Sequence, residues 1–118
     1  MPIPGEHHFE IYAGDTPQNK KWQLFQPDGV TPQNLAGATV VLQARRAIFD
    51  VEPIIDLTAV MNTPDQGAFH FEFPARLAFL VENQARTVLL YDMELRRNGE
   101  IKTLARGNLT IVKDITHD

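Results

Sequence analysis

Residues 87–112 read TVLLYDMELRRNGEIKTLARGNLTIV, and this stretch decides the fold. Apolar and polar residues alternate on both sides of Asn98-Gly99. An Asn-Gly pair between two alternating runs is the strongest short-range indication of a β-hairpin that a sequence offers. The sequence therefore predicts two long antiparallel strands here, and we expect the rest of the chain to pack against them.

The length of the hairpin loop follows from the side chains, because directly opposed residues of antiparallel strands share one face of the sheet. A two-residue loop would set Leu95 against Lys102, an apolar residue against a charged one. A three-residue loop over 97–99, with Gly99 as a left-handed bulge, sets Leu95 against Ile101 instead. The same register gives the core-face pairs Met93–Thr103 and Tyr91–Ala105 and the charge pairs Glu94–Lys102 and Arg96–Glu100. We therefore predict the three-residue loop.

Length and composition indicate one globular domain over residues 1–118. Apolar residues make up 43% and charged residues 22%, which is close to ordinary globular usage. No apolar run approaches the roughly 20 residues that a membrane-spanning helix needs, and residues 1–8 lack the basic and apolar regions of a secretory signal. A formal net charge of −4 provides no positive field for phosphate. We expect synthesis in the cytosol, and neither a membrane nor a nucleic acid as partner.

Upstream of the hairpin, short alternating runs separated by turn residues are typical of an antiparallel β-sandwich. One helix is expected, because Pro74 suits a first helical position and is followed by apolar residues at helical spacing. The predicted strands are 7–12, 21–26, 38–45, 53–58 and 68–73, the helix is 74–81, and turns or loops are expected at 14–17, 27–29 and 62–67. With the hairpin, this predicts an all-β sandwich of seven strands with one short crossover helix.

The same alternation predicts which side chains enter the core. The β-branched run at 39–41 makes a strand there more favourable than a helix. The residues expected to face inward are Phe9, Ile11, Trp22, Leu24, Val40, Leu42, Ala44, Phe69, Phe71 and Phe73, with Leu35 at the edge of the core. Three aromatic rings therefore come from the single strand 68–73.

No catalytic set emerges from the sequence. The chain has no serine and no cysteine, which removes the common nucleophiles, disulfides and cysteine-ligated zinc. His7 and His8 point to opposite faces of one strand, and His117 lies close to the C-terminus. His70 and Glu72 share an outer strand face and are suited to binding a metal or moving a proton, but alternation alone also places polar residues outward. We predict no catalytic residue, no metal site and no cofactor.

Two other sets of side chains, a carboxylate pair and three aromatic rings, are of types that act on or bind sugars. Asp92 and Glu94 are the only close carboxylates on a regular element, and a glycosidase needs two facing carboxyl groups. In the predicted register Glu94 already has a cation opposite it, so we predict no enzyme. Trp22, Tyr12 and Tyr91 are the rings from which a sugar-stacking platform would be built, although two of them fall on predicted core faces. A small carbohydrate-binding module is therefore the alternative function.

A series of short motifs extends along most of the chain. They are, in order, Gly14-Asp15-Thr16, Trp22-Gln23-Leu24, Asp28-Gly29, NLAGATV at 34–40 with the strand ending near Arg45, Gly67-Ala68-Phe69, YDMEL at 91–95, Gly107 and residues 111–116. In order and spacing they resemble the N-terminal immunoglobulin-like domain of tailed-phage baseplate upper proteins and related phage or prophage tail components.

The resemblance implies an immunoglobulin-like sandwich in a non-enzymatic virion protein, made in the bacterial cytoplasm. It implies assembly with other tail or baseplate proteins, or with itself as a homo-oligomer in a symmetric ring, and no active-site residue. Members of that family commonly continue into long fibrous or receptor-facing regions, whereas this chain ends at Asp118. A stand-alone cap or adaptor is therefore expected.

An interaction role also agrees with the outward-facing residues. In the predicted register Leu104 opposes Asp92 and Leu90 opposes Arg106, which would leave an apolar strip of the kind that marks a partner surface. Alternatively, part of this strip lies beneath the crossing segment 74–81. The candidate interface residues are Phe25, Val41, Leu90, Leu104 and Arg106.

Overall fold

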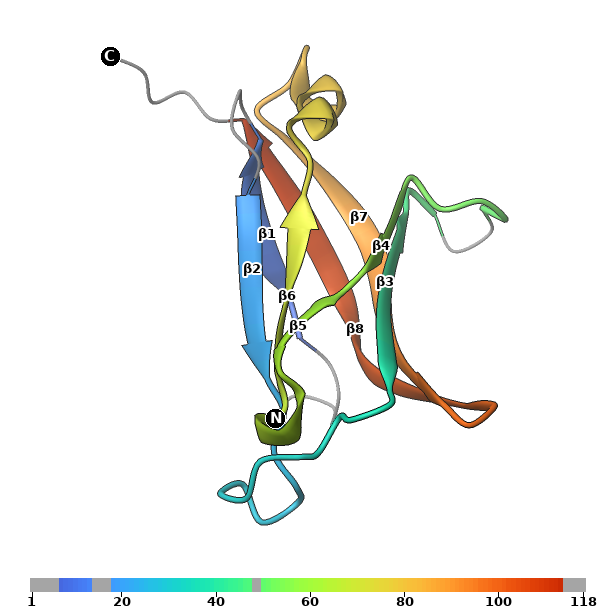
Figure 1. Cartoon of the computed structure of the whole chain (residues 1–118). Helices are drawn as coiled ribbons and strands as arrows, with labels where there is room; N and C mark the ends of the chain where they lie inside the picture. Colours follow the sequence, from blue (N-terminus) through green and yellow to red (C-terminus); the bar gives the residue numbers. More distant parts are fainter. Residues whose placement is uncertain (1–6, 14–17, 48–49, 114–118) are drawn as a thin grey trace.

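The chain folds into two β-sheets that pack face to face (Figure 1). The computed structural model describes residues 7–13, 18–47 and 50–113. The larger sheet has the strand order β1-β8-β7-β3-β4 and the smaller has β2-β6-β5. The elements are β1 (Phe9–Ala13), β2 (Gln18–Gln23), β3 (Thr39–Arg45), β4 (Ile55–Thr58), β5 (Val60–Thr63), β6 (Ala68–Phe73), β7 (Arg86–Arg97) and β8 (Glu100–Lys113), with the 3-10 helices η1 (Pro64–Gln66) and η2 (Ala75–Val81). The predicted all-β sandwich is confirmed.

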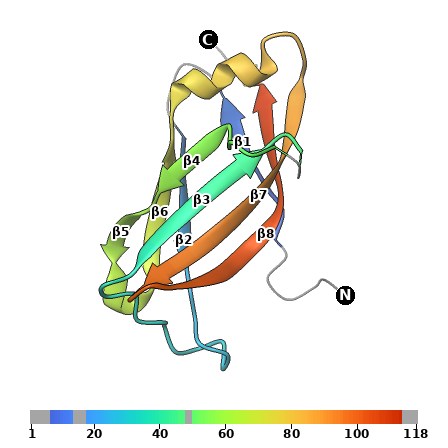
Figure 2. The same ribbon diagram turned by 90° about the vertical axis from the view of Figure 1, so that its right-hand side faces the viewer.

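The strand order is that of an immunoglobulin-like sandwich. Strands β8, β7, β3 and β4 lie side by side as strands G, F, C and C′ do, and β2, β6 and β5 form the opposite sheet as B, E and D do. Strand β1 pairs in parallel with β8, whereas the remaining pairings are antiparallel. The segment η2 carries the chain across one end of the sandwich from β6 to β7 (Figure 2).

The predicted three-residue hairpin loop is wrong. Arg97 pairs with Glu100, so the loop consists of Asn98 and Gly99 alone. Their φ angles are 52° and 80°, and a two-residue type I′ turn requires positive φ at both positions. Consequently Glu94 opposes Thr103 rather than a lysine, and Ile101, expected in the core, is 63% exposed.

A β-bulge in β8 explains why the side chains misled the register argument. The pairing shifts between Met93 and Glu94, and Leu104 is the extra residue. The bulge lets Met93 oppose Ala105, with both buried, although the loop has only two residues. Towards the tip the hairpin projects past the smaller sheet (Figure 1), so Lys102 opposite Leu95 stays exposed. The prediction assumed one continuous register and therefore placed the irregularity in the loop.

Deleting Leu104 is expected to be tolerated, because removal of the extra residue leaves the pairs on both sides of the bulge unchanged. The expected loss is about 1–2 kcal/mol, from the half-buried contact of this side chain with the core. Deleting Thr110 instead should prevent folding, because a one-residue shift turns the side chains of β8 that pair with β1 to the opposite face of the sheet. Soluble yield and urea unfolding of the two deletion variants distinguish these outcomes. Equal behaviour would contradict the assignment of the bulge.

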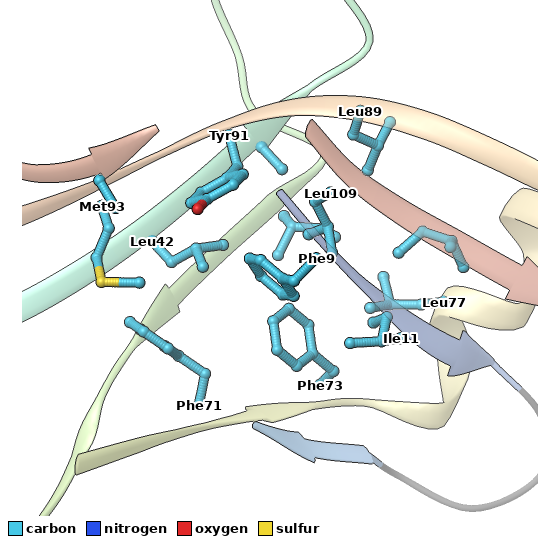
Figure 3. Close-up of a cluster of buried hydrophobic side chains, with 14 of the residues drawn as sticks. Phe9, Ile11, Leu42, Phe71, Phe73, Leu77, Leu89, Tyr91, Met93 and Leu109 are labelled. Carbon is cyan, nitrogen blue, oxygen red and sulfur yellow. The ribbon is translucent and has the colours of Figure 1, made fainter. Parts of the chain in front are cut away.

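The core lies between the two sheets (Figure 3). Phe71 and Phe73 of β6 point from the smaller sheet toward Leu42, Met93 and Phe9 of the larger one. The inward-facing predictions are confirmed for Phe9, Ile11, Leu35, Val40, Leu42, Ala44, Phe69, Phe71 and Phe73, which are buried, and Trp22 and Leu24 pack on this cluster half-buried. Alternation therefore identified most of the core.

Several element boundaries differ from prediction. Strand β5 was missed, so the described residues form eight strands instead of seven, because its side chains are largely exposed and show no alternation. Strand β2 ends at Gln23, and the following residues, expected to continue it, form a loop. Pro74 occupies the N-cap position, one residue before the first helical position that was predicted for it, and η2 is a 3-10 helix. The predicted turn at 14–17 and His117 lie outside the described residues.

Candidate functional site

The outer face of the five-stranded sheet, toward the viewer in Figure 2, carries a pocket of about 640 Å³. Register explains how its residues meet. Leu90 pairs with Arg45 on one side and Asn108 on the other, and Asp92 pairs with Arg106. Residues at alternate positions of neighbouring strands share a face, so these side chains converge on one surface. His8, which precedes β1, completes this side of the pocket.

The approach of the N-terminal segment to β8 shapes the edge of the pocket. The backbone N–H of His7 donates to the carbonyl oxygen of Arg106 at 2.9 Å, and the N–H of Asn108 donates to Nδ1 of His8 at 2.9 Å. Gly107 lies between these contacts, and a Cβ there would collide with the carbonyl oxygen of His7. A glycine is needed at this position because the two backbones pass so closely.

Tyr91 anchors the same crossing from the inside of the sandwich. Its side chain is 4% exposed, and its hydroxyl donates to the carbonyl oxygen of His7 at 2.5 Å. Phe9 packs edge-on against its ring at a centroid distance of 5.0 Å. Burial raises the pKa of Tyr91 to about 12. The folded protein therefore favours the protonated hydroxyl of Tyr91, which is the form that donates this hydrogen bond.

Stability is expected to fall at alkaline pH because of Tyr91. Its folded pKa is raised, so its contribution is fully present below the ordinary value of 10.0 and is lost as the pH rises toward about 12. Tyr91→Phe should cost about 1 kcal/mol below this interval, from the lost hydrogen bond, and should show a weaker decline across it. Urea unfolding of both proteins over the interval measures the difference. If the free energy of unfolding of both proteins falls equally across this interval, ionisation of Tyr91 is not linked to folding.

Both acidic and basic side chains line the pocket. The pKa of Asp92 is raised by burial and then by the charge of Glu94, while Arg45 and Arg96 partly oppose the shift. Glu94 accepts a hydrogen bond from Nη2 of Arg96 at 3.0 Å. Within the described residues the guanidinium of Arg106 forms no ion pair or hydrogen bond, and Arg106 is exposed. Of the two arginines that line the pocket, Arg45 donates a hydrogen bond to Gln43 at 3.1 Å, so Arg106 is the one available to a binding partner.

The predicted interface residues do not form one strip. Leu90 and Arg106 do lie on the outer face and line the pocket, but Leu90 pairs with Asn108 rather than Arg106. Val41 stands in the outer row between Glu94 and Thr58 and is only 7% exposed. Leu104, predicted to face outward, packs against the core instead, because the bulge turns it. Phe25 is 44% exposed on a separate loop.

The crossing segment does not cover the pocket. Leu77, Leu80 and Val81 of η2 are buried members of the core, at one end of the sandwich (Figure 2). Leu90, which was the predicted strip residue nearest to that end, remains 40% exposed. The alternative that η2 shields this face is therefore wrong for Leu90.

The remaining sequence candidates lie elsewhere. His70, on the outer face of the smaller sheet, contacts Glu72 through Nε2 at 3.0 Å and Asn62 through Nδ1 at 3.0 Å. Both ring nitrogens thus have protein partners, and the part of the chain that the structure describes has no group of three or more histidine, aspartate or glutamate side chains placed to hold a metal. Asp92 and Glu94 share the outer face of β7, but without the predicted cation from β8 opposite Glu94.

The three rings of the proposed sugar platform lie apart. Tyr12 is 49% exposed on the outer face of the larger sheet, whereas Tyr91 is buried on its inner face. Trp22 is half-buried against Phe9, at a centroid distance of 5.3 Å, and against His7. A flat platform requires rings on a common exposed face, and these three do not share one.

Sequence reasoning missed the pocket as a unit. His8 and Asn108 are 100 residues apart and meet only because β1 pairs in parallel with β8. The local sequence carries no indication of that pairing, since a parallel neighbour is set by the topology. Gly107 was the available hint, because a glycine inside a strand often marks close approach of another backbone.

No family model matches this chain, and no curated protein matches its sequence. None of the helices in the described residues has the length and apolar character needed to cross a membrane.

Proposed function

We propose that this protein is a non-enzymatic structural subunit of a phage or prophage tail or baseplate and acts through protein–protein assembly in the virion. The observation that carries the proposal is the apolar part of the outer face of the larger sheet. Tyr12, Val88 and Leu90 are 49%, 50% and 40% exposed there. Val112 pairs with Tyr12 on one side and with Arg86 on the other, and it is the diagonal neighbour of Val88, which pairs with Thr110. Contiguous apolar side chains on an exposed sheet face favour a partner surface.

The surroundings of these residues support the same proposal. Arg106 and Asp92 border the apolar part, and interfaces commonly combine an apolar centre with a polar rim. The order and spacing of the motifs from Trp22 to Gly107 add the resemblance to tail components. Other tail or baseplate proteins are the expected partners, with no nucleic acid and no cofactor.

The proposal is tested by co-expressing the full chain with the products of the neighbouring genes and measuring co-purification and mass by light scattering. Neighbouring tail genes and a stable complex are expected. Val88→Lys should abolish the complex, because it places a charge in the apolar surface. Val60→Lys is the matched control, since Val60 is 42% exposed on an edge strand of the other sheet. A gene neighbourhood without tail genes, together with no complex, would exclude the proposal.

A further inference from the structure

A second surface feature, far from the pocket, is a tightly built loop between β2 and β3. In this loop, residues 25–32, Phe25 forms an isolated antiparallel bridge with Pro32, and the N–H of Gln26 donates to the carbonyl oxygen of Thr31 at 2.8 Å. Its base is tied to the rest of the fold, since the N–H of Leu24 donates to the carbonyl oxygen of Gly67 at 3.0 Å. We call residues 25–32 the Val30 loop.

Asp28 fixes the conformation of the Val30 loop. Its Oδ1 accepts hydrogen bonds from the N–H groups of Val30 and Thr31, both at 2.9 Å, and its Oδ2 accepts one from the hydroxyl of Thr31 at 2.6 Å. The hydroxyl and backbone bonds to Thr31 and the bond to Val30 lower the pKa of Asp28, so the carboxylate is ionised at neutral pH. The loop is held in shape by its own hydrogen bonds, and a rigid segment loses little entropy on binding.

The Val30 loop presents an apolar tip with one negative charge. Val30 is 77% exposed and Phe25 is 44% exposed. Asp28 is the only charged residue in the loop, and among the described residues its Oδ2 accepts one hydrogen bond, from the hydroxyl of Thr31. The surface that fits such a tip has an apolar wall and an available cation.

The pocket on the outer face has both properties. Leu90 and Val51 provide apolar wall, and Arg106 provides a cation with no ion pair in the described residues. A volume of about 640 Å³ is ample for a valine and its neighbours. Asp50 and Asp92 also line the pocket, so the match in charge lies in the one pairing of Asp28 with Arg106, beside the match in size and apolar wall.

One molecule cannot use its own loop in its own pocket. The Val30 loop lies beyond the end of the smaller sheet, at the bottom of Figure 1, while the pocket lies on the outer face of the larger sheet. We infer that the Val30 loop of one copy inserts into the Arg106 pocket of a second copy, with Asp28 pairing with Arg106. This contact is head-to-tail, because it joins two different surfaces, and such contacts build closed rings or filaments. The inference rests on the proposed function and specifies how copies of the subunit join.

The test uses light scattering and analytical ultracentrifugation of the full chain, with circular dichroism to confirm folding. The unmodified protein should associate in a concentration-dependent way. Val30→Asp places a charge on the apolar tip, and Arg106→Glu reverses the charge of the pocket cation. Each of these variants should be monomeric. Ile101→Asp is the matched control, since Ile101 is 63% exposed at the hairpin and belongs to neither surface, and it should associate normally.

Mixing the two monomeric variants gives the decisive result. Val30→Asp retains an intact pocket and Arg106→Glu retains an intact tip, so the mixture should form a one-to-one heterodimer and nothing larger. Asp28→Asn, which can keep the turn through its amide oxygen, should weaken association about tenfold or more by removing the charge. Val30→Ser and Arg106→Gln are used if either charged variant fails to fold.

Undiminished association of Val30→Asp, a mixture that stays monomeric, or an unmodified protein that is monomeric at high concentration would each overturn the inference. Each of these results leaves the proposed function intact if the co-purified tail complex forms and Val88→Lys abolishes it.

Discussion

Replacing Phe71 by alanine is expected to lower the free energy of unfolding by about 3–5 kcal/mol. Phe71 has no exposed surface, packs edge-on against Phe69 at a centroid distance of 5.8 Å, and points at Met93 and Leu42 across the sandwich (Figure 3). The substitution removes the whole phenyl ring from the centre of the core and leaves a cavity that two sheets tied by backbone hydrogen bonds cannot close. Denaturant unfolding measured by tryptophan fluorescence and circular dichroism gives the change.

Phe79→Ala provides the matched control for this prediction. The same atoms are removed, but Phe79 is 48% exposed on η2, so the expected loss is below about 1 kcal/mol. Equal losses in the two variants would mean that the aromatic side of β6 is not the centre of the core.

Replacing Gly67 by alanine should cost about 2–5 kcal/mol, from two separate causes. Gly67 has φ of 73°, a left-handed conformation that is unfavourable by about 1–2 kcal/mol for an L-residue. In addition, the new Cβ would stand 2.5 Å from the carbonyl oxygen of Leu24 and 2.8 Å from that of Gln33. Both are backbone atoms, so relief requires moving the base of the Val30 loop, which adds about 1–3 kcal/mol.

Gly37→Ala separates the two causes. Its φ is 78°, close to that of Gly67, but a Cβ at this position meets no atom within 4 Å. Its expected cost is therefore only the conformational part, about 1–2 kcal/mol. The two variants are compared by their losses in free energy of unfolding in urea, and the difference measures the cost of crowding at Gly67. A difference near zero would show that the base of the Val30 loop moves aside at no cost.

The sequence was sufficient for the fold class because alternation reports burial directly. Phe69, Phe71 and Phe73 occupy one face of β6 and are all buried, as their spacing predicts. The hairpin was also located correctly from Asn98-Gly99. Its register was not, because a bulge at Leu104 has the same effect on facing as a longer loop, and only the positions of backbone hydrogen bonds distinguish the two.

The candidate site was less accessible to sequence reasoning than the core. Leu90 and Arg106 were selected as outward-facing residues, and both line the pocket. Their neighbours could not be chosen, because His8 reaches Asn108 through pairing between the first and last described strands. Contacts over such a distance in the chain depend on the completed topology, which no local pattern encodes.

The parallel pairing of β1 with β8 has a mechanical consequence. Five residue pairs join the strands, from Phe9 with Leu109 to Ala13 with Lys113. A force that pulls the N-terminal end of β1 away from the C-terminal end of β8 acts along both strands, so it loads their hydrogen bonds together in shear instead of opening them one by one. Resistance to such a force depends on the rate of unfolding. The protein, held at these two strands, would therefore withstand tension along its length better than its folding free energy alone suggests.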